Sequence, residues 1–201
     1  MITIINYGLG NVSAFENIYR SINIRTKIAC RPDDLNDATH ILLPGVGSFD
    51  KAVTLLEDSY LKDAIIQKIQ DNVNLLGICI GMHVLGTRSD EGHLQGLNVI
   101  PGVVRKINDN NCLIPHMGWN NISKKCENRL MDGISSKDYF YFLHSYTFIP
   151  EDTSSIISDT EYSCKFASGV NKGNIYGIQF HPEKSHKSGI NLLKNFAEIQ
   201  C

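Results

Sequence analysis

The chain has 201 residues, a length that fits one domain and suffices to bury a substantial core. Hydrophobic residues make up 42% and charged residues 20%, as in ordinary globular proteins, and the formal net charge is -2. This composition, which has no basic block, argues against nucleic-acid binding and against attachment to an anionic membrane. The N-terminus lacks the positive region of a signal peptide, and no apolar run reaches the roughly 20 residues of a spanning helix, so we expect a cytoplasmic enzyme.

Short apolar runs alternate with helical patterns in the first half of the chain. Such alternation is typical of a parallel sheet with crossover helices. We predict strands over residues 2–6, 24–29, 40–44 and 73–78, and helices over residues 12–22 and 50–71.

The second half has more strand-like runs separated by turn residues. Strands are predicted over residues 97–107, 111–115, 139–146, 154–158 and 174–180, and a closing amphipathic helix over 189–199. The chain shows no internal repeat and no linker. The sequence therefore predicts one α/β domain over residues 1–201, with a central, mostly parallel sheet flanked by helices and a more antiparallel C-terminal half.

Six cysteines occur without any Cys-x-x-Cys pair and without histidines at metal-ligand spacing, so we expect free thiols and no metal site. Five of them are interpreted as small buried hydrophobic residues. These are Cys30, Cys112, Cys126, Cys164 and Cys201, whereas Cys79 has surroundings that favour chemistry.

Residues 77–81 read Gly-Ile-Cys-Ile-Gly, directly after an apolar run and before a predicted helix. A nucleophile between two glycines at a strand-to-helix turn is typical of a nucleophile elbow. The tight turn exposes the sulfur of Cys79, the glycines keep neighbouring Cβ atoms away from it, and the helix dipole favours the thiolate. A buried structural cysteine between two incidental glycines is the alternative.

His181 and Glu183 follow the last predicted strand, on either side of Pro182. In an extended chain, residues two apart point to the same side, and a proline disfavours helix at the residue before it. Both side chains can therefore face one site, where the carboxylate orients an imidazole that activates a thiol. Alone, such a His-x-Glu pair is more often part of a surface loop.

A glycine-containing loop, Pro-Gly-Val-Gly-Ser-Phe, follows the predicted strand at residues 40–44. Backbone N–H groups near Gly45, Val46 and Gly47 can turn toward an anion, and with the amide of Ile80 they suit an oxyanion hole. A simple strand-to-helix turn is the alternative.

Nucleophile, base, orienting carboxylate and oxyanion loop together resemble the class I (triad) glutamine amidotransferases, whose motifs are Gly-x-Cys-x-Gly and a later His-Pro-Glu. Further segments are similar to the glutaminase subunits of imidazole glycerol phosphate synthase. They begin at Tyr7, Pro44, Pro115, His144 and Gly173, and together they span nearly the whole chain.

The resemblance implies that Cys79 attacks the side-chain amide of glutamine, with His181 as the base and Glu183 holding that histidine. It implies a contact of Glu91 with the substrate α-amino group, and contacts of the backbone of Ser145 and Tyr146 with the α-carboxylate. No metal or organic cofactor is implied.

The same resemblance implies a partner, a (βα)₈-barrel cyclase that receives ammonia through a tunnel and forms a heterodimer with the glutaminase. Only a short helical segment follows Lys184, so we also expect the ammonia acceptor to be a separate chain. Glutamine hydrolysis by the isolated chain is expected to be slow. The implied docking residues are Asn11, Met117, Trp119 and Lys184.

One position departs from the family pattern, because His83 stands where a glutamine usually contacts the substrate. A neutral imidazole can donate one hydrogen bond and accept another, so it can partly replace an amide. An alternative function therefore stays open, in which the chain supplies ammonia to a sugar amidotransferase of surface polysaccharide synthesis. A silent scaffold and a cysteine peptidase on the same fold are further alternatives, which the motifs disfavour.

Overall fold

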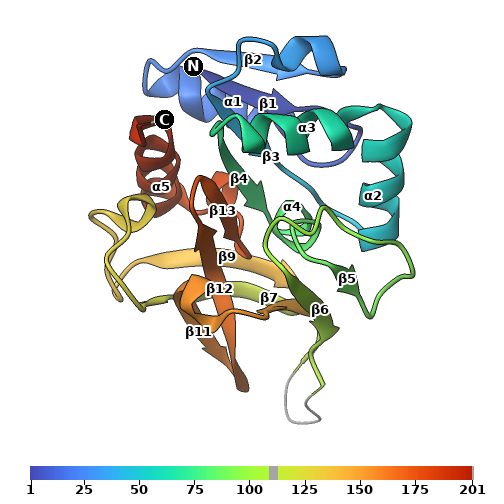
Figure 1. The fold of residues 1–201 in the computed structure, drawn as a ribbon. Coiled ribbons are helices and arrows are strands. Elements are labelled where there is room, and N and C mark those ends of the chain that lie inside the picture. Colours follow the sequence, from blue (N-terminus) through green and yellow to red (C-terminus); the bar gives the residue numbers. More distant parts are fainter. Residues whose placement is uncertain (109–112, 201) are drawn as a thin grey trace.

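An eight-stranded sheet runs through the centre of the protein in the computed structural model, which describes residues 1–108 and 113–200 (Figure 1). Neighbouring strands are parallel across the first part of the sheet and antiparallel across the rest. The prediction of a mostly parallel sheet with a more antiparallel C-terminal half is confirmed. In spatial order the strands are β2 (Thr26–Ala29), β1 (Ile2–Ile5), β3 (His40–Leu43), β4 (Asn74–Ile78), β13 (Ile175–Ile178), β12 (Cys164–Lys172), β11 (Ile156–Tyr162) and β8 (Ser123–Lys124).

Helices cover both faces of this sheet (Figure 1). They are α1 (Val12–Ser21), α2 (Phe49–Asp58), α3 (Leu61–Gln70), the short α4 (Ile80–His83) and α5 (His186–Glu198). Four 3-10 turns accompany them among the described residues: η1 (Pro32–Leu35), η2 (Arg129–Met131), η3 (Thr153–Ser155) and η4 (Pro182–Lys184).

Alternate residues of the central strands supply two separate apolar cores, as the two-residue period of a strand requires. In β3, Leu43 packs into the core that contains α2 and α3, whereas Leu42 packs into the core that contains α1 and α5. Both leucines are fully buried. The central strands β1, β3 and β4 are buried and mostly apolar because each of their faces is covered.

Two smaller sheets lie beside the C-terminal half of the large one (Figure 1). One contains β10 (Tyr146–Pro150), β6 (Gly102–Lys106) and β5 (Arg88–Ser89), and the other pairs β7 (His116–Asn121) with β9 (Tyr139–His144) in antiparallel register. Since β9 and β10 are consecutive, their connecting residue Ser145 links the two small sheets.

The predicted helix over residues 50–71 is wrong as one element, because it is divided into α2 and α3 at Ser59 and Tyr60. Tyr60 adopts a left-handed backbone conformation with φ 58°, and the hydroxyl of Ser59 donates to the carbonyl of Leu55. The apolar spacing continues across this break, so periodicity did not reveal it.

Several predicted strands have different bounds. The strand predicted over 97–107 begins only at Gly102 as β6, and the strand predicted over 139–146 is two strands, β9 and β10, separated at Ser145. Residues 154–158 begin with the η3 turn, and β11 starts only at Ile156. In the predicted strand over 111–115, positions 111 and 112 lie outside the described residues, and residues 113–115 are not a strand because pairing with β9 begins at His116.

The interpretation of the other cysteines as buried is wrong for Cys30, Cys126 and Cys164, which are exposed free thiols. Cys30 directly follows the edge strand β2, and Cys164 follows a turn in which Ser163 has φ 57°. Connecting segments at the edges of a fold generally run over its surface, and these three cysteines lie in or directly beside such segments. Cys112 and Cys201 lie outside the described residues.

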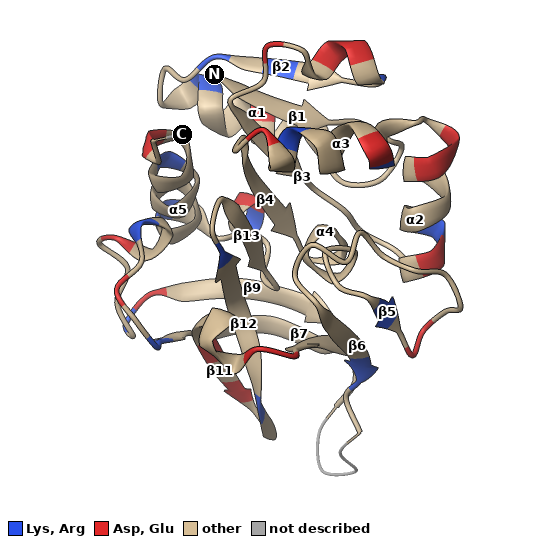
Figure 2. Ribbon diagram, in the orientation of Figure 1, with Lys and Arg blue, Asp and Glu red and all other residues tan. Residues whose placement is uncertain are grey.

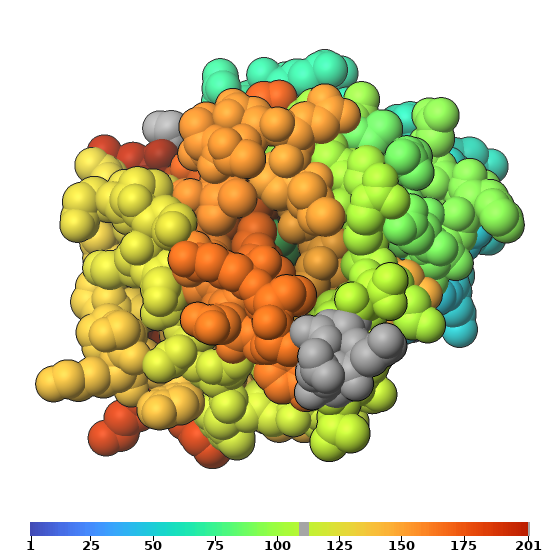
Figure 3. All heavy atoms as spheres, turned by 90° about the horizontal axis from the view of Figure 1, so that it is seen from below, coloured from blue at the N-terminus to red at the C-terminus, as the bar shows by residue number. Residues whose placement is uncertain are grey.

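Acidic and basic residues are interspersed along the ribbon (Figure 2). Within residues 1–108 and 113–200, no helix has the length and apolarity that crossing a membrane requires. Seen from below, the surface is hollowed between β6 and the orange segment of β11 and β12 (Figure 3). Cys79 is not among the residues that line this cleft of about 380 Å³.

The break between α2 and α3 generates a stability prediction. Tyr60→Gly is expected to raise the free energy of unfolding by about 0.5–1 kcal/mol, because glycine adopts the left-handed conformation without steric cost and Tyr60 is 78% exposed. Urea unfolding followed by circular dichroism measures the change. Lys51→Gly, at an exposed position inside α2, is the control and is expected to lose about 1 kcal/mol. Equal losses in both variants would contradict the prediction.

Candidate active site

Cys79 stands between β4 and α4 with a strained backbone, at φ 55° and ψ −110°. Its N–H donates to the carbonyl of Ile178 in β13, and its carbonyl accepts from the N–H of His83 in α4. The residue is thus held from both sides in a conformation that costs about 1–3 kcal/mol. The predicted nucleophile elbow is confirmed as a backbone feature.

The two flanking glycines are required, for a reason that differs from the prediction. A Cβ atom on Gly77 would collide with the carbonyl of Gly81, and one on Gly81 would collide with the carbonyl of Leu43. The glycines therefore allow α4 to pack directly against β4 and β3, rather than clearing space around the sulfur itself.

The base and its orienting carboxylate are also in place. Nδ1 of His181 lies 2.9 Å from Oε1 of Glu183, and both side chains are almost fully buried. His181 itself is extended, as predicted, while η4 begins at Pro182. Because a carboxylate accepts, Nδ1 carries the proton and Nε2 faces the site.

The charges around His181 favour its protonated form. Burial acts to lower the pKa of His181, but Cys79 and Glu183 outweigh burial and raise that pKa well above its ordinary value. Nε2 makes no hydrogen bond of acceptable geometry with any atom of the described residues and is left to face Cys79. The contribution of this histidine to stability is complete below its unfolded pKa of about 6.5 and is lost as the pH rises through the folded value.

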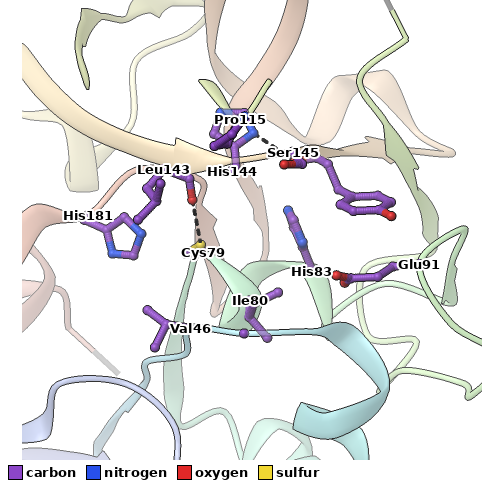
Figure 4. Close-up of a pocket in the computed structure, with 12 residues that line it drawn as sticks. Val46, Cys79, Ile80, His83, Glu91, Pro115, Leu143, His144, Ser145 and His181 are labelled. Atoms are coloured by element: carbon purple, nitrogen blue, oxygen red, sulfur yellow. Dashed lines mark hydrogen bonds between the residues drawn. The ribbon is translucent and has the colours of Figure 1, made fainter. Parts of the chain in front are cut away.

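A cavity of about 250 Å³ opens above Cys79 (Figure 4). Its size suits a small metabolite rather than a polymer. The residues that line it are Val46, Gly47, Cys79, Ile80, His83, Glu91, Pro115, Leu143, His144, Ser145, Tyr146 and His181. The structure thus brings together all the predicted substrate and oxyanion residues except Gly45, which packs behind the site.

Gly45 packs closely against Tyr7 and against the first residues of α4. A Cβ atom at Gly45 would lie 2.7 Å from the hydroxyl oxygen of Tyr7 and 3.2 Å from the backbone nitrogen of Gly81. The predicted oxyanion loop therefore rests directly on α4 and on Tyr7. Sequence reasoning missed Tyr7, whose buried hydroxyl has no hydrogen-bond partner in the described part of the chain.

His83 is buried in the cavity wall and is fixed by a residue that sequence reasoning also missed. Its Nε2 lies 2.8 Å from Oε1 of Gln179, whose Nε2 in turn lies 4.0 Å from the sulfur of Cys79. Burial lowers the pKa of His83 to about 4, so the ring is neutral at pH 7. Nδ1 is then left as an acceptor. Gln179 precedes His181 by two residues, and this spacing on an extended chain was an available signal.

Glu91 points into the cavity, and one of its oxygens is already engaged. Oε2 of Glu91 accepts a hydrogen bond of 2.8 Å from the N–H of Phe49, the first residue of α2. Both carboxylate oxygens of Asp50 accept from the N–H of His93, which anchors the same loop. Glu91 is therefore held at the N-terminus of α2 with its other oxygen available.

The predicted docking residues fall into two places. Met117 and Trp119 are exposed on the same side of β7, and Trp119 stacks on His186 at 5.1 Å between ring centroids. Lys184 lies beside them, with its ammonium 5.3 Å from the centre of the Tyr141 ring. Asn11 instead caps α1, accepting from the N–H of Ala14, and borders a small cavity behind Glu183.

A strained cysteine at the end of a central strand, with a buried histidine–carboxylate pair just after the neighbouring strand, defines the class of α/β enzymes that act through a cysteine nucleophile. Comparisons with known proteins narrow this class. The family model for class-I glutamine amidotransferase matches residues 4–199. A protein of Methanococcus maripaludis, named imidazole glycerol phosphate synthase subunit HisH 2, is 46% identical over 198 residues, which cover 98% of each chain.

A second relative, imidazole glycerol phosphate synthase subunit HisH of Bdellovibrio bacteriovorus, is 43% identical over 204 residues, covering 99% of this chain and all of the relative. The solved structure of PurLQS from Thermotoga maritima has a TM-score of 0.77 at 15% identity, covering 98% of this chain and 96% of that one. That likeness concerns the fold alone. The chain belongs to the class-I glutamine amidotransferase family and, within it, to the family of HisH subunits.

The close packing of α4 generates the prediction for this region. Gly81→Ala is expected to lower the free energy of unfolding by about 1–3 kcal/mol, because the new methyl group overlaps the Leu43 carbonyl. Gly173→Ala is the comparison, since its Cβ would meet nothing and only its φ of 60° is unfavourable, with an expected loss of about 1 kcal/mol. Thermal and urea unfolding measure both variants. A neutral Gly81→Ala would refute this account of the elbow.

Proposed function

We propose that the chain is the glutaminase subunit of an imidazole glycerol phosphate synthase in histidine biosynthesis, acting as one catalytic domain over residues 1–201. It hydrolyses L-glutamine to glutamate and ammonia. The observation that carries the proposal is the strained, buried Cys79 beside the His181–Glu183 pair in a chain whose relatives match it over nearly their full length.

In the proposed mechanism the sulfur of Cys79 attacks the carboxamide carbon of glutamine. The raised pKa of His181 makes its imidazole a strong acceptor for the proton that the attacking thiol gives up. The tetrahedral intermediate collapses as His181 gives its proton to the leaving nitrogen, and ammonia departs. Water, deprotonated by His181, then cleaves the γ-glutamyl thioester to release glutamate, while Glu183 holds the imidazole throughout.

Residues of the cavity wall are proposed to hold the rest of the substrate. Backbone amides at Val46–Gly47 and at Ile80 stabilise the oxyanion, with Gly45 supporting the loop. The free oxygen of Glu91 takes the α-ammonium group, and the backbone at Ser145 and Tyr146 takes the α-carboxylate. None of these steps requires a metal or an organic cofactor.

The relatives are named as subunits, and a subunit implies a partner. We propose a (βα)₈-barrel cyclase as that partner, in a cytoplasmic heterodimer that passes ammonia directly between the active sites. Met117 and Trp119 offer exposed surface for docking of the residue types that protein interfaces favour, and Lys184 adds a positive charge at its edge. Asn11, which borders a small cavity together with His181 and Glu183, is proposed to join this interface.

Partner capture and labelling of Cys79 test the proposed function. The tagged chain, recovered from native lysate, is expected to bring down a barrel cyclase, and glutamate release is expected to rise at least about tenfold in the complex. Cys79→Ala should abolish both turnover and labelling by a glutamine-analogue diazoketone. Capture of a sugar amidotransferase would refute the pathway but keep the glutaminase, whereas absence of labelling in the complex would refute the glutaminase.

His83 is expected to contact the substrate through Nδ1, the acceptor that no described residue satisfies. His83→Gln should therefore change the KM for glutamine by about threefold to tenfold, with a smaller change in kcat, because one hydrogen bond at the cavity wall is altered. Steady-state kinetics of the complex measures this. An unchanged KM would show that His83 only positions Gln179.

A further inference from the structure

Two buried histidines outside the triad contact each other beside the substrate cavity. His116 in β7 and His144 in β9 are directly paired across the strands, with Nδ1 of His116 2.9 Å from Nε2 of His144. His144 also lines the cavity (Figure 4), and its Nδ1 lies 2.9 Å from the carbonyl oxygen of Tyr146. Neither ring takes part in the mechanism above.

The partners of these rings determine every proton position. A carbonyl oxygen only accepts, so Nδ1 of His144 carries a proton and its Nε2 is a bare acceptor. Nδ1 of His116 must then donate to that acceptor, which leaves Nε2 of His116 as the acceptor at the outer end. The Asn120 amide group, held 3.0 Å from the carbonyl of Glu161, faces this nitrogen at 3.5 Å. The result is a hydrogen-bond relay in which Asn120 donates to His116, His116 donates to His144, and His144 donates to the carbonyl of Tyr146.

This hydrogen-bond relay requires both rings to be neutral, because an additional proton on either one would place two N–H groups face to face. Burial lowers the pKa of His116 to about 4 and that of His144 to about 3, and the neighbouring His83 and His181 also disfavour charge on His144. His116 is further stacked between the rings of Phe142 and Tyr162, at centroid distances of 4.8 and 3.9 Å.

The hydrogen-bond relay ends at the carbonyl of Tyr146, on backbone that faces the cavity. Tyr146 is opposite Lys106 in the antiparallel ladder, and the N–H of Ile107 donates to the carbonyl of Ser145. This pattern marks Tyr146 and Lys106 as a pair without direct hydrogen bonds, so the N–H and C=O of Tyr146 both point away from β6. His144 donates to that carbonyl, while the N–H of Ile107 holds the neighbouring Ser145 carbonyl, whose peptide carries the N–H of Tyr146. The two hydrogen bonds together hold Tyr146 in the conformation in which its N–H and C=O both face away from β6.

We propose that the His116–His144 pair positions the Ser145–Tyr146 backbone and so determines how strongly the site discriminates in favour of a substrate with an α-carboxylate. The inference rests on the proposed glutaminase function. Both histidines act through the backbone without touching the reacting atoms, so they are positioning residues. Their contribution is expected in KM and in substrate choice, because within the described residues no hydrogen bond joins either ring to the side chains of Cys79, His181 or Glu183.

The test compares glutamine with 4-aminobutanamide, which is glutamine without its α-carboxylate, in the complex with the cyclase. His116→Phe keeps the ring stacking but removes the donor. It is expected to raise the KM for glutamine about tenfold with kcat changed less than about twofold, and to leave kcat/KM for 4-aminobutanamide within about twofold. His116→Asn retains a donor on the atom next to Cγ and should recover most of the discrimination. Equal losses for both substrates, or no loss for glutamine, would overturn the inference.

A second pair of variants covers the case in which His116→Phe does not fold. His144→Asn keeps a donor at the position of Nδ1 and should retain discrimination, whereas His144→Gln moves that donor outward and should lose it. Separately from turnover, nitrogen NMR of the imidazoles in the unliganded chain should show both rings protonated at Nδ1 only. A proton on Nε2 of either ring would overturn the inference even if the glutaminase proposal stands, and an inactive complex with the expected tautomers would refute only the glutaminase.

Discussion

The strained backbone at Cys79 is the constraint on which the rest of the site depends. Its conformation persists because β4 is enclosed between β3 and β13, and because α4 lies against both β3 and β4 without any intervening Cβ atom. Strain of this kind is retained only where the surroundings determine it more than once. The loop at Gly45 also packs closely against the start of α4, so Cys79 and the loop proposed to form the oxyanion hole are positioned together.

The parallel pairing of β4 with β13 explains how residues from distant parts of the sequence meet. Ile78 and Ile178 are register partners, so the chain leaves both strands at the same edge of the sheet. Cys79 follows one strand directly, and Gln179 and His181 follow the other on one side of an extended segment. A shift of one residue in this register would turn both side chains away from the sulfur.

Residues whose chemistry depends on local backbone were predictable, since the elbow at Cys79 and the His181–Glu183 pair are each contained in a few consecutive positions. The division of α2 from α3 was not, because a left-handed residue such as Tyr60 leaves the apolar spacing unchanged. Gln179 and His144 were missed as well, because His83 of α4 and His116 of β7, which fix them, are far from them in the sequence. The burial of the surface cysteines was misjudged, because the residue type alone does not say where a cysteine lies in the fold. Their exposure follows from their places in the strand ends and connecting segments.

The location of the thiols has a practical consequence for any chemistry done on this protein. Cys30, Cys126 and Cys164 are open to solvent, while Cys79 is 5% exposed at the bottom of its cavity. Oxidants and large maleimides will therefore modify the outer sulfurs first and can join copies of the chain through intermolecular disulfides without touching the nucleophile. A count of reactive thiols in the unmodified protein would therefore measure mainly these three surface cysteines. Measurements on Cys79 are best made in a variant in which serine replaces all three.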